Sequence, residues 1–83
     1  CLSGLTKIVI PDSVTTIGSG AFSLCSVLEE VVFSNSVQKI ENRAFNMCHR
    51  LNGVYFDGTK SDWNSIIIED GNENLLEATL YFR

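Results

Sequence analysis

A 23-residue spacing of apolar side chains is the feature of this sequence that most restricts its fold. Leu5, Leu28 and Leu51 are each 23 residues apart. Between them the same classes of side chain recur in register: Ile8 and Val31, Ile10 and Phe33, Val14 and Val37, Ile17 and Ile40, Phe22 and Phe45, Cys25 and Cys48. A unit this short cannot bury its own apolar edge, so copies must stack to form a continuous core.

Each unit predicts three local structures. The pattern Leu-x-x-Ile-x-Ile predicts a short strand, which Pro11 ends in the first unit and Ser34 in the second. The spacing of Val14 and Ile17 predicts a second short extended or turning segment. Apolar residues at i, i+1 and i+4, as in Ala21-Phe22-x-x-Cys25, predict one helical turn.

The first unit resembles the BspA-like leucine-rich repeat, the 23-residue class common in bacterial surface proteins. The residues that carry the resemblance are Leu5, Ile8, Ile10, Pro11, Ser13, Val14, Ile17, Gly18, Ala21, Phe22, Cys25 and Leu28. The similarity covers Leu2 to about Phe56, with Ser34 in place of the proline and Glu41 in place of the glycine in the second unit.

The resemblance implies a fold and a function. The implied fold is an α/β solenoid, a right-handed coil with short parallel strands on one face and short helical or turn segments on the other. The implied function is that of an exported, non-enzymatic bacterial protein, extracellular or on the cell surface, that binds an extracellular or host-surface protein.

Within one domain of residues 1–83, we expect repeats over 1–56 and a closing cap over 57–83. In the cap, Ser61 or Asp62 is expected to begin a short helix whose Trp63 seals the core. The sequence 70–72 predicts a turn, and Asn74 is expected to begin a second helical turn. Residues 79–82 alternate as a final strand, with Leu80 and Phe82 facing inward.

The N-terminal repeat begins in mid-unit, at a strand whose edge would be unpaired. We therefore expect that neighbouring repeats precede it in a longer parent protein. An open edge of this kind could also pair with a second copy of the chain, so edge-to-edge self-association is a further expectation.

Composition excludes several classes of protein. Of the 83 residues 45% are hydrophobic and 19% charged, which excludes a disordered tail or a coiled coil. The net charge of −4 disfavours a nucleic-acid partner. The longest aliphatic run, residues 66–68, is too short for membrane insertion.

Motifs for catalysis, cofactors or metals are incomplete. Residues 53–61 fall short of a phosphate-binding loop because Thr59 precedes the lysine, and 70–81 fall short of a calcium loop. Cys25 and Cys48 are interpreted as buried free thiols, and His49 as an exposed turn residue. We expect no cofactor, no metal and no enzymatic activity.

Residues between the buried strand positions point outward and form two columns across the predicted sheet. One column holds Lys7, Glu30 and Gly53, and the other holds Val9, Val32, Tyr55 and Tyr81. A strand exposed on one face normally places polar residues there, so the valines and tyrosines indicate a contact surface. The alternative is that such residues simply suit a sheet. The candidate protein-binding residues are Lys7, Val9, Glu30, Val32, Tyr55 and Tyr81.

Two other functions stay open. The chain could be a purely structural cap and spacer of a longer surface protein, with recognition elsewhere. It could also be attached to a catalytic domain upstream.

Overall fold

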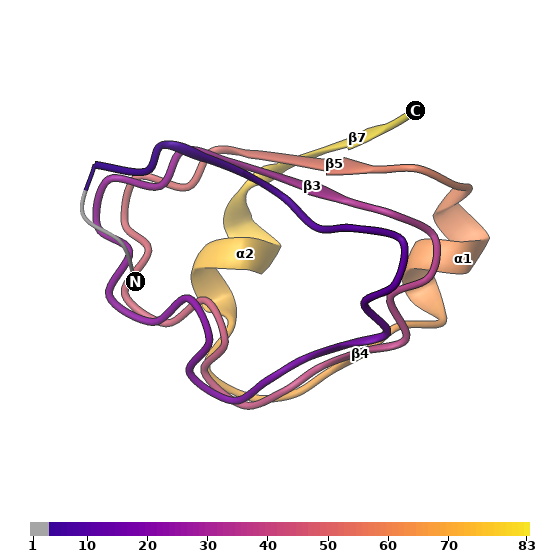
Figure 1. Ribbon diagram of the computed structural model, residues 1–83, viewed down its shortest axis with the longest axis horizontal. Helices are drawn as coiled ribbons and strands as arrows, with labels where there is room; N and C mark the ends of the chain where they lie inside the picture. Colours follow the sequence, from indigo (N-terminus) through magenta and orange to yellow (C-terminus); the bar gives the residue numbers. More distant parts are fainter. Residues whose placement is uncertain (1–3) are drawn as a thin grey trace.

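A computed structural model describes residues 4–83, so Leu2, where the predicted similarity begins, lies outside the described residues. These described residues form two parallel sheets and two short helices (Figure 1). The first sheet has the order β1 (Lys7–Val9), β3 (Glu30–Phe33), β5 (Gly53–Phe56) and β7 (Thr79–Phe82). The second has the order β2 (Thr16–Ile17), β4 (Lys39–Ile40) and β6 (Ile67–Ile68). The helices are α1 (Lys60–Asn64) and α2 (Glu73–Glu77).

Successive passes of the chain lie on one another in register. Each of the first three passes, here called rungs, contributes one strand to each sheet, and the rungs overlie one another in Figure 1. Ile8 pairs with Val31, Val31 with Val54, and Val54 with Leu80. Ile8, Val31 and Val54 are buried, and Leu80 is partly buried. The 23-residue period therefore aligns the buried faces of β1, β3 and β5, as the sequence predicted.

Aromatic side chains fill the core between the two sheets. Phe33, Phe45 and Phe56 are completely or almost completely buried. Trp63 lies against two of these rings, with centroid distances of 5.9 Å to Phe33 and 5.4 Å to Phe56. The prediction that Trp63 packs on the apolar core is therefore confirmed. Phe82 meets the edge of Phe56 but remains 42% exposed, so the inward face of the last strand is only partly covered.

The segments expected to form a helical turn, residues 21–25 and 44–48, form consecutive turns instead. Leu24 and Met47, at equivalent repeat positions, have φ angles of 64° and 63°, which a right-handed helix does not allow. The N–H groups of Gly20, Phe22 and Leu24 donate to carbonyls of the next rung rather than within a helix. Hydrogen bonding between rungs therefore overrides the helical pattern.

Two glutamates connect these turns from one rung to the next. The Glu41 carboxylate accepts a hydrogen bond from Ser19 N–H at 3.2 Å, and the Glu69 carboxylate accepts one from Asn42 N–H at 3.0 Å. Lys39 lies 3.9 Å from the first carboxylate and 3.6 Å from the second. Glu41, which replaces the repeat's glycine, thus supplies an acceptor to the rung before it.

The third rung departs from the period through α1. In each of the first two rungs, the strand in the second sheet starts nine residues after the strand in the first sheet. In the third rung the corresponding strands start at Gly53 and Ile67, which are fourteen residues apart. The extra residues form α1, which Thr59 begins, not Ser61 or Asp62 as the sequence predicted. The Thr59 hydroxyl accepts from Asp62 N–H, and the Asp62 carboxylate accepts from Thr59 N–H. This reciprocal pair is a capping box and it fixes the helix start.

A buried asparagine replaces the missing turn of the third rung. Asn72 is 1% exposed, and its Oδ1 accepts from Phe45 N–H at 2.9 Å. Its Nδ2 donates to the carbonyls of Glu41 and Glu69 at 3.1 and 2.8 Å. The side chain thus provides the acceptor that the carbonyl of Ala44 provides to Phe22 one rung earlier.

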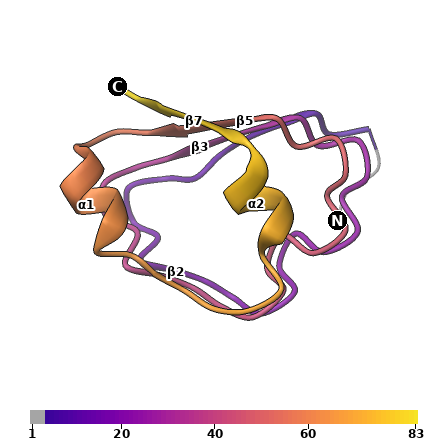
Figure 2. The same ribbon diagram turned by 180° about the vertical axis from the view of Figure 1, so that it is seen from behind.

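The chain then turns into α2, which lies inside the outline of the rungs (Figures 1 and 2). The predicted turn at 70–72 is confirmed, but α2 begins after Asn72 rather than at Asn74. Gly71 allows this path because its φ angle is +87° and an added Cβ would lie 3.2 Å from the Arg43 backbone.

The two repeat cysteines differ in state. Cys48 is a buried free thiol, as predicted. The same interpretation is wrong for Cys25, which is disulfide-bonded. Both side chains lie in the core, so their burial agrees with the sequence and only the redox state of Cys25 differs.

We predict that Asn72→Ala lowers the free energy of unfolding by about 3 kcal/mol, because one N–H and two carbonyls lose their buried partner. Urea denaturation followed by circular dichroism measures the change. Asn42→Ala is the matched control, since that exposed side chain makes no hydrogen bond within residues 4–83 and its loss should have little effect. Equal stabilities of the two variants would contradict the role given to Asn72.

Trp63→Ala should cost about 3–5 kcal/mol, since it leaves a cavity beside Phe33 and Phe56. The same denaturation measurement applies, with the exposed Leu76→Ala as the control that stays within about 0.5 kcal/mol of the parent. A Trp63→Ala variant as stable as that control would show that the indole does not seal the core.

Candidate functional site

The outward side of the four-stranded sheet, here called the sheet face, carries the predicted candidate residues. Strand pairing places Lys7, Glu30, Gly53 and Thr79 in one row across the sheet. A second row holds Val9, Val32, Tyr55 and Tyr81. The two columns predicted from the repeat spacing are therefore real neighbours in space.

Exposure divides the members of the second row. Val9 is 64% exposed and Tyr81 is 46% exposed, while Tyr55 is partly buried. Val32 is only 8% exposed, so the expectation that its side chain stands exposed to solvent is wrong. Its place in the row is correct, but as a residue of an inner strand it forms part of the lining of a hollow described below.

A hydrogen bond fixes Tyr55 on the sheet face. Its hydroxyl donates to Glu30 Oε2 at 2.9 Å, across two neighbouring strands. Gly53 lies beside this contact, and a Cβ added there would lie 3.4 Å from the Tyr55 ring and 3.6 Å from Glu30 Cγ. The backbone of Gly53 thus lies close to both the tyrosine ring and the glutamate side chain, and a Cβ there would make ordinary van der Waals contacts with them.

The same hydrogen bond raises the pKa of Tyr55 above its ordinary value. The main cause is donation to Glu30, with smaller contributions from desolvation and from the negative charge of the carboxylate. Donation to an acceptor stabilises the protonated phenol, so the neutral form is the one that the folded sheet favours.

Tyr55 also stacks on Tyr81 of the next strand. Their ring centroids are 4.8 Å apart and the planes differ by 15°. The Glu30 contact holds one ring and the stacking holds the other, so both are oriented before any partner binds. Two ordered tyrosines offer amphipathic contact area with little conformational entropy left to lose.

A hollow of about 260 Å³ lies on the sheet face. Its lining includes Lys7, Glu30, Val32, Tyr55 and Arg83. Sequence reasoning missed Arg83, although residues 79, 81 and 83 alternate along one side of the last strand. That period of two could have indicated it.

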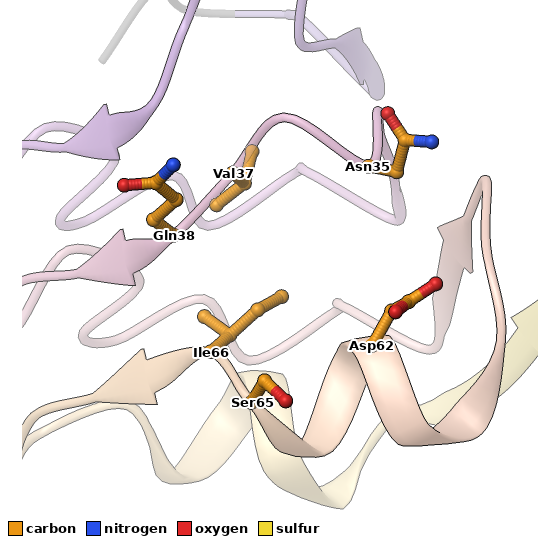
Figure 3. Close-up of a pocket in the computed structure, with 6 residues that line it drawn as sticks. All are labelled: Asn35, Val37, Gln38, Asp62, Ser65 and Ile66. Carbon is orange, nitrogen blue, oxygen red and sulfur yellow. The ribbon is translucent and has the colours of Figure 1, made fainter.

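Two further hollows lie away from the sheet face. One, of about 290 Å³, is bounded by the turn after β3 and by α1, with Asn35, Gln38, Asp62 and Ser65 around buried Val37 and Ile66 (Figure 3). It lies where the third rung, because of α1, no longer follows the backbone course of the first two rungs. The other, of about 410 Å³, is lined by residues 49–52 and Glu29 and includes the exposed His49.

Possible metal ligands and the Cys48 thiol are groups that metal or covalent chemistry would use. Across residues 4–83 no three His, Cys, Asp or Glu side chains gather into a group that could hold a metal ion. Burial raises the pKa of the Cys48 thiol, which opposes formation of the reactive thiolate. Over the same residues, no helix is long and apolar enough to cross a membrane.

The repeat register and the paired sheets agree with a comparison with known families. A family model described as BspA type Leucine rich repeat region (6 copies) matches residues 1–75. The chain belongs to this family. No curated protein and no solved structure matches the chain.

Membership carries general consequences. A leucine-rich repeat family implies a solenoid-like fold, and such repeats generally mediate protein–protein interaction. Proteins with BspA type repeats are typically surface or secreted bacterial proteins. The resemblance seen in the sequence is thereby confirmed, whereas the identity of a partner is a separate question.

The Tyr55–Glu30 contact predicts a pH dependence. Because the folded pKa of Tyr55 is raised, the contact stabilises the fold below pH ~10 and is lost as the pH rises through the raised pKa. In a Tyr81→Phe background only Tyr55 contributes a phenolate signal, since the chain has two tyrosines. Adding Glu30→Ala should lower the pH midpoint of the phenolate absorbance, whereas the exposed Glu29→Ala should leave it unchanged. An unchanged midpoint in the Glu30 variant would contradict the contact.

Proposed function

We propose that this chain is a non-enzymatic protein-binding module of a surface or secreted protein, and that it binds through the sheet face. The observation that carries the proposal is the row of Val9, Val32, Tyr55 and Tyr81 in register across four strands. At its two ends Val9 and Tyr81 leave apolar area exposed. Membership in a repeat family that generally binds proteins supports the same function.

The arrangement of the tyrosines supports binding more directly than their mere presence does. β-Branched and aromatic residues suit any sheet, but a sheet preference alone does not require a stacked pair tied to a carboxylate. Ordered aromatic side chains are the usual anchors of protein interfaces because they bury much area at small entropic cost.

We further propose that the rungs coil with a right hand. The support is the parallel pairing in both sheets, because connections between parallel strands of one sheet are right-handed in nearly all proteins. Burial raises the pKa of the Cys48 thiol, which counts against this residue as a catalytic nucleophile.

A structural role as cap and spacer is the second candidate. Its supporting observation is the irregular third rung, where Trp63 and Asn72 cover the core and satisfy its backbone groups. This role concerns the end of the stack, whereas protein binding concerns the sheet face, so separate substitutions test them.

The deciding experiment is a binding screen of the chain against a panel of purified extracellular-matrix and host-surface proteins. A Val9→Ser/Tyr55→Ser/Tyr81→Ser variant is screened beside it, after circular dichroism has shown the parent spectrum. We expect at least one panel member to bind the parent and to bind the variant at least ~10-fold more weakly, since anchor residues dominate interface energies.

The matched control is Ile67→Ser/Leu76→Ser, which removes two exposed aliphatic side chains away from the sheet face. This variant should bind as the parent does. If both variants lost binding affinity equally, the binding site would not be on the sheet face. Absence of binding by the parent to the whole panel would favour the structural role.

A further inference from the structure

We infer, on the basis of the proposed function, that the sheet face binds a protein segment in which a carboxylate side chain lies next to an aromatic or aliphatic one. The carboxylate would enter the hollow lined by Lys7 and Arg83, and the apolar neighbour would lie on Tyr81 or Val9.

The two cations reach this hollow from opposite edges of the sheet. Lys7 belongs to β1, and Arg83 follows β7, the strand at the other edge. Both nevertheless line the same hollow of about 260 Å³, together with Val32 and Tyr55. A group placed there can meet an ammonium from one side and a guanidinium from the other.

Neither Lys7 nor Arg83 forms an ion pair with another residue among residues 4–83. The two ion pairs found there are both made by Lys39. Glu30 pairs with Lys7 in the strand register, but its Oε2 accepts the Tyr55 hydroxyl. With the Glu30 carboxylate counted, the side chains of the hollow keep one excess positive charge on a protein whose net charge is −4. Such a local reversal of sign steers an acidic partner to this one place.

The presence of Glu30 in the same hollow selects the kind of anion. Among the side chains of the hollow, two cations and one carboxylate leave a single excess positive charge. A carboxylate carries one negative charge and balances this excess, whereas a phosphate monoester at neutral pH carries close to two. Arginine also matches the planar geometry of a carboxylate with two parallel hydrogen bonds.

Apolar contact area lies beside the charged hollow. Val9 is two residues from Lys7 on the same strand, and Tyr81 is two residues from Arg83, so each cation has an exposed apolar neighbour on the sheet face. A segment that binds both kinds of group must alternate acidic and apolar side chains over a few residues.

The test uses a phage-displayed library of random heptapeptides selected on the immobilised chain. We expect selected peptides to be enriched in Asp or Glu beside an aromatic or aliphatic residue. A synthetic peptide of the selected sequence should bind ~10-fold more weakly after its acid is changed to the amide, and its affinity should fall as salt is raised.

Protein variants complete the design. Lys7→Gln/Arg83→Gln should weaken binding of the acidic peptide ~10-fold, whereas Arg50→Gln/Lys60→Gln, which removes two exposed cations elsewhere, should not. If the selected peptides are neutral or basic and bind the Tyr81→Ser variant more weakly than the parent, the inference of an acidic partner is wrong and the proposed function stands. Peptides unaffected by Tyr81→Ser, or no enrichment at all, would contradict both.

Discussion

Hydrogen bonding between parallel rungs is the interaction on which the rest of this structure depends. Strands of two to four residues have no stability alone, and here each inner strand pairs on both edges with strands of neighbouring rungs. The requirement extends into the turns, where alternate N–H groups donate to the next rung. It explains why Leu24 and Met47 accept a left-handed backbone and why the apolar spacing typical of a helix does not produce one.

The end of the repeat pattern creates a specific problem, because the second rung presents donors and acceptors that a regular third turn would satisfy. Asn72 solves it with one side chain that supplies an acceptor to Phe45 and donors to two carbonyls. Because the Asn72 side chain satisfies these backbone groups, the residues after it can form α2 instead of a regular turn. The preceding helix, α1, places Trp63 on the aromatic core. The irregular rung therefore follows the same rule of satisfied backbone groups as the regular ones.

The sheet face inherits its properties from the same register. Strand pairing aligns outward residues as strictly as inward ones, with an offset of 23 residues from β1 to β3 and from β3 to β5, so small differences between repeats decide the surface chemistry. Position 53 is a glycine where the preceding repeats have Lys7 and Glu30, and beside it the Tyr55 hydroxyl donates to Glu30. Tyr81 then stacks on Tyr55. A conserved geometry with variable side chains is how repeat proteins acquire different partners on one scaffold.

The amino-acid sequence by itself determined the period, the register of the four-stranded sheet, the inward residues of its first three strands and the two outward columns, because side chains alternate along strands and the repeat keeps them in phase. Only the tertiary structure decided which hydrogen bonds the turns would make, where the two helices begin and which outward residues stay exposed. Val32 is buried, Arg83 lines the hollow with Lys7, and Asn72 points inward rather than capping α2. These outcomes depend on partners far away in the chain, and local propensity carries no information about them.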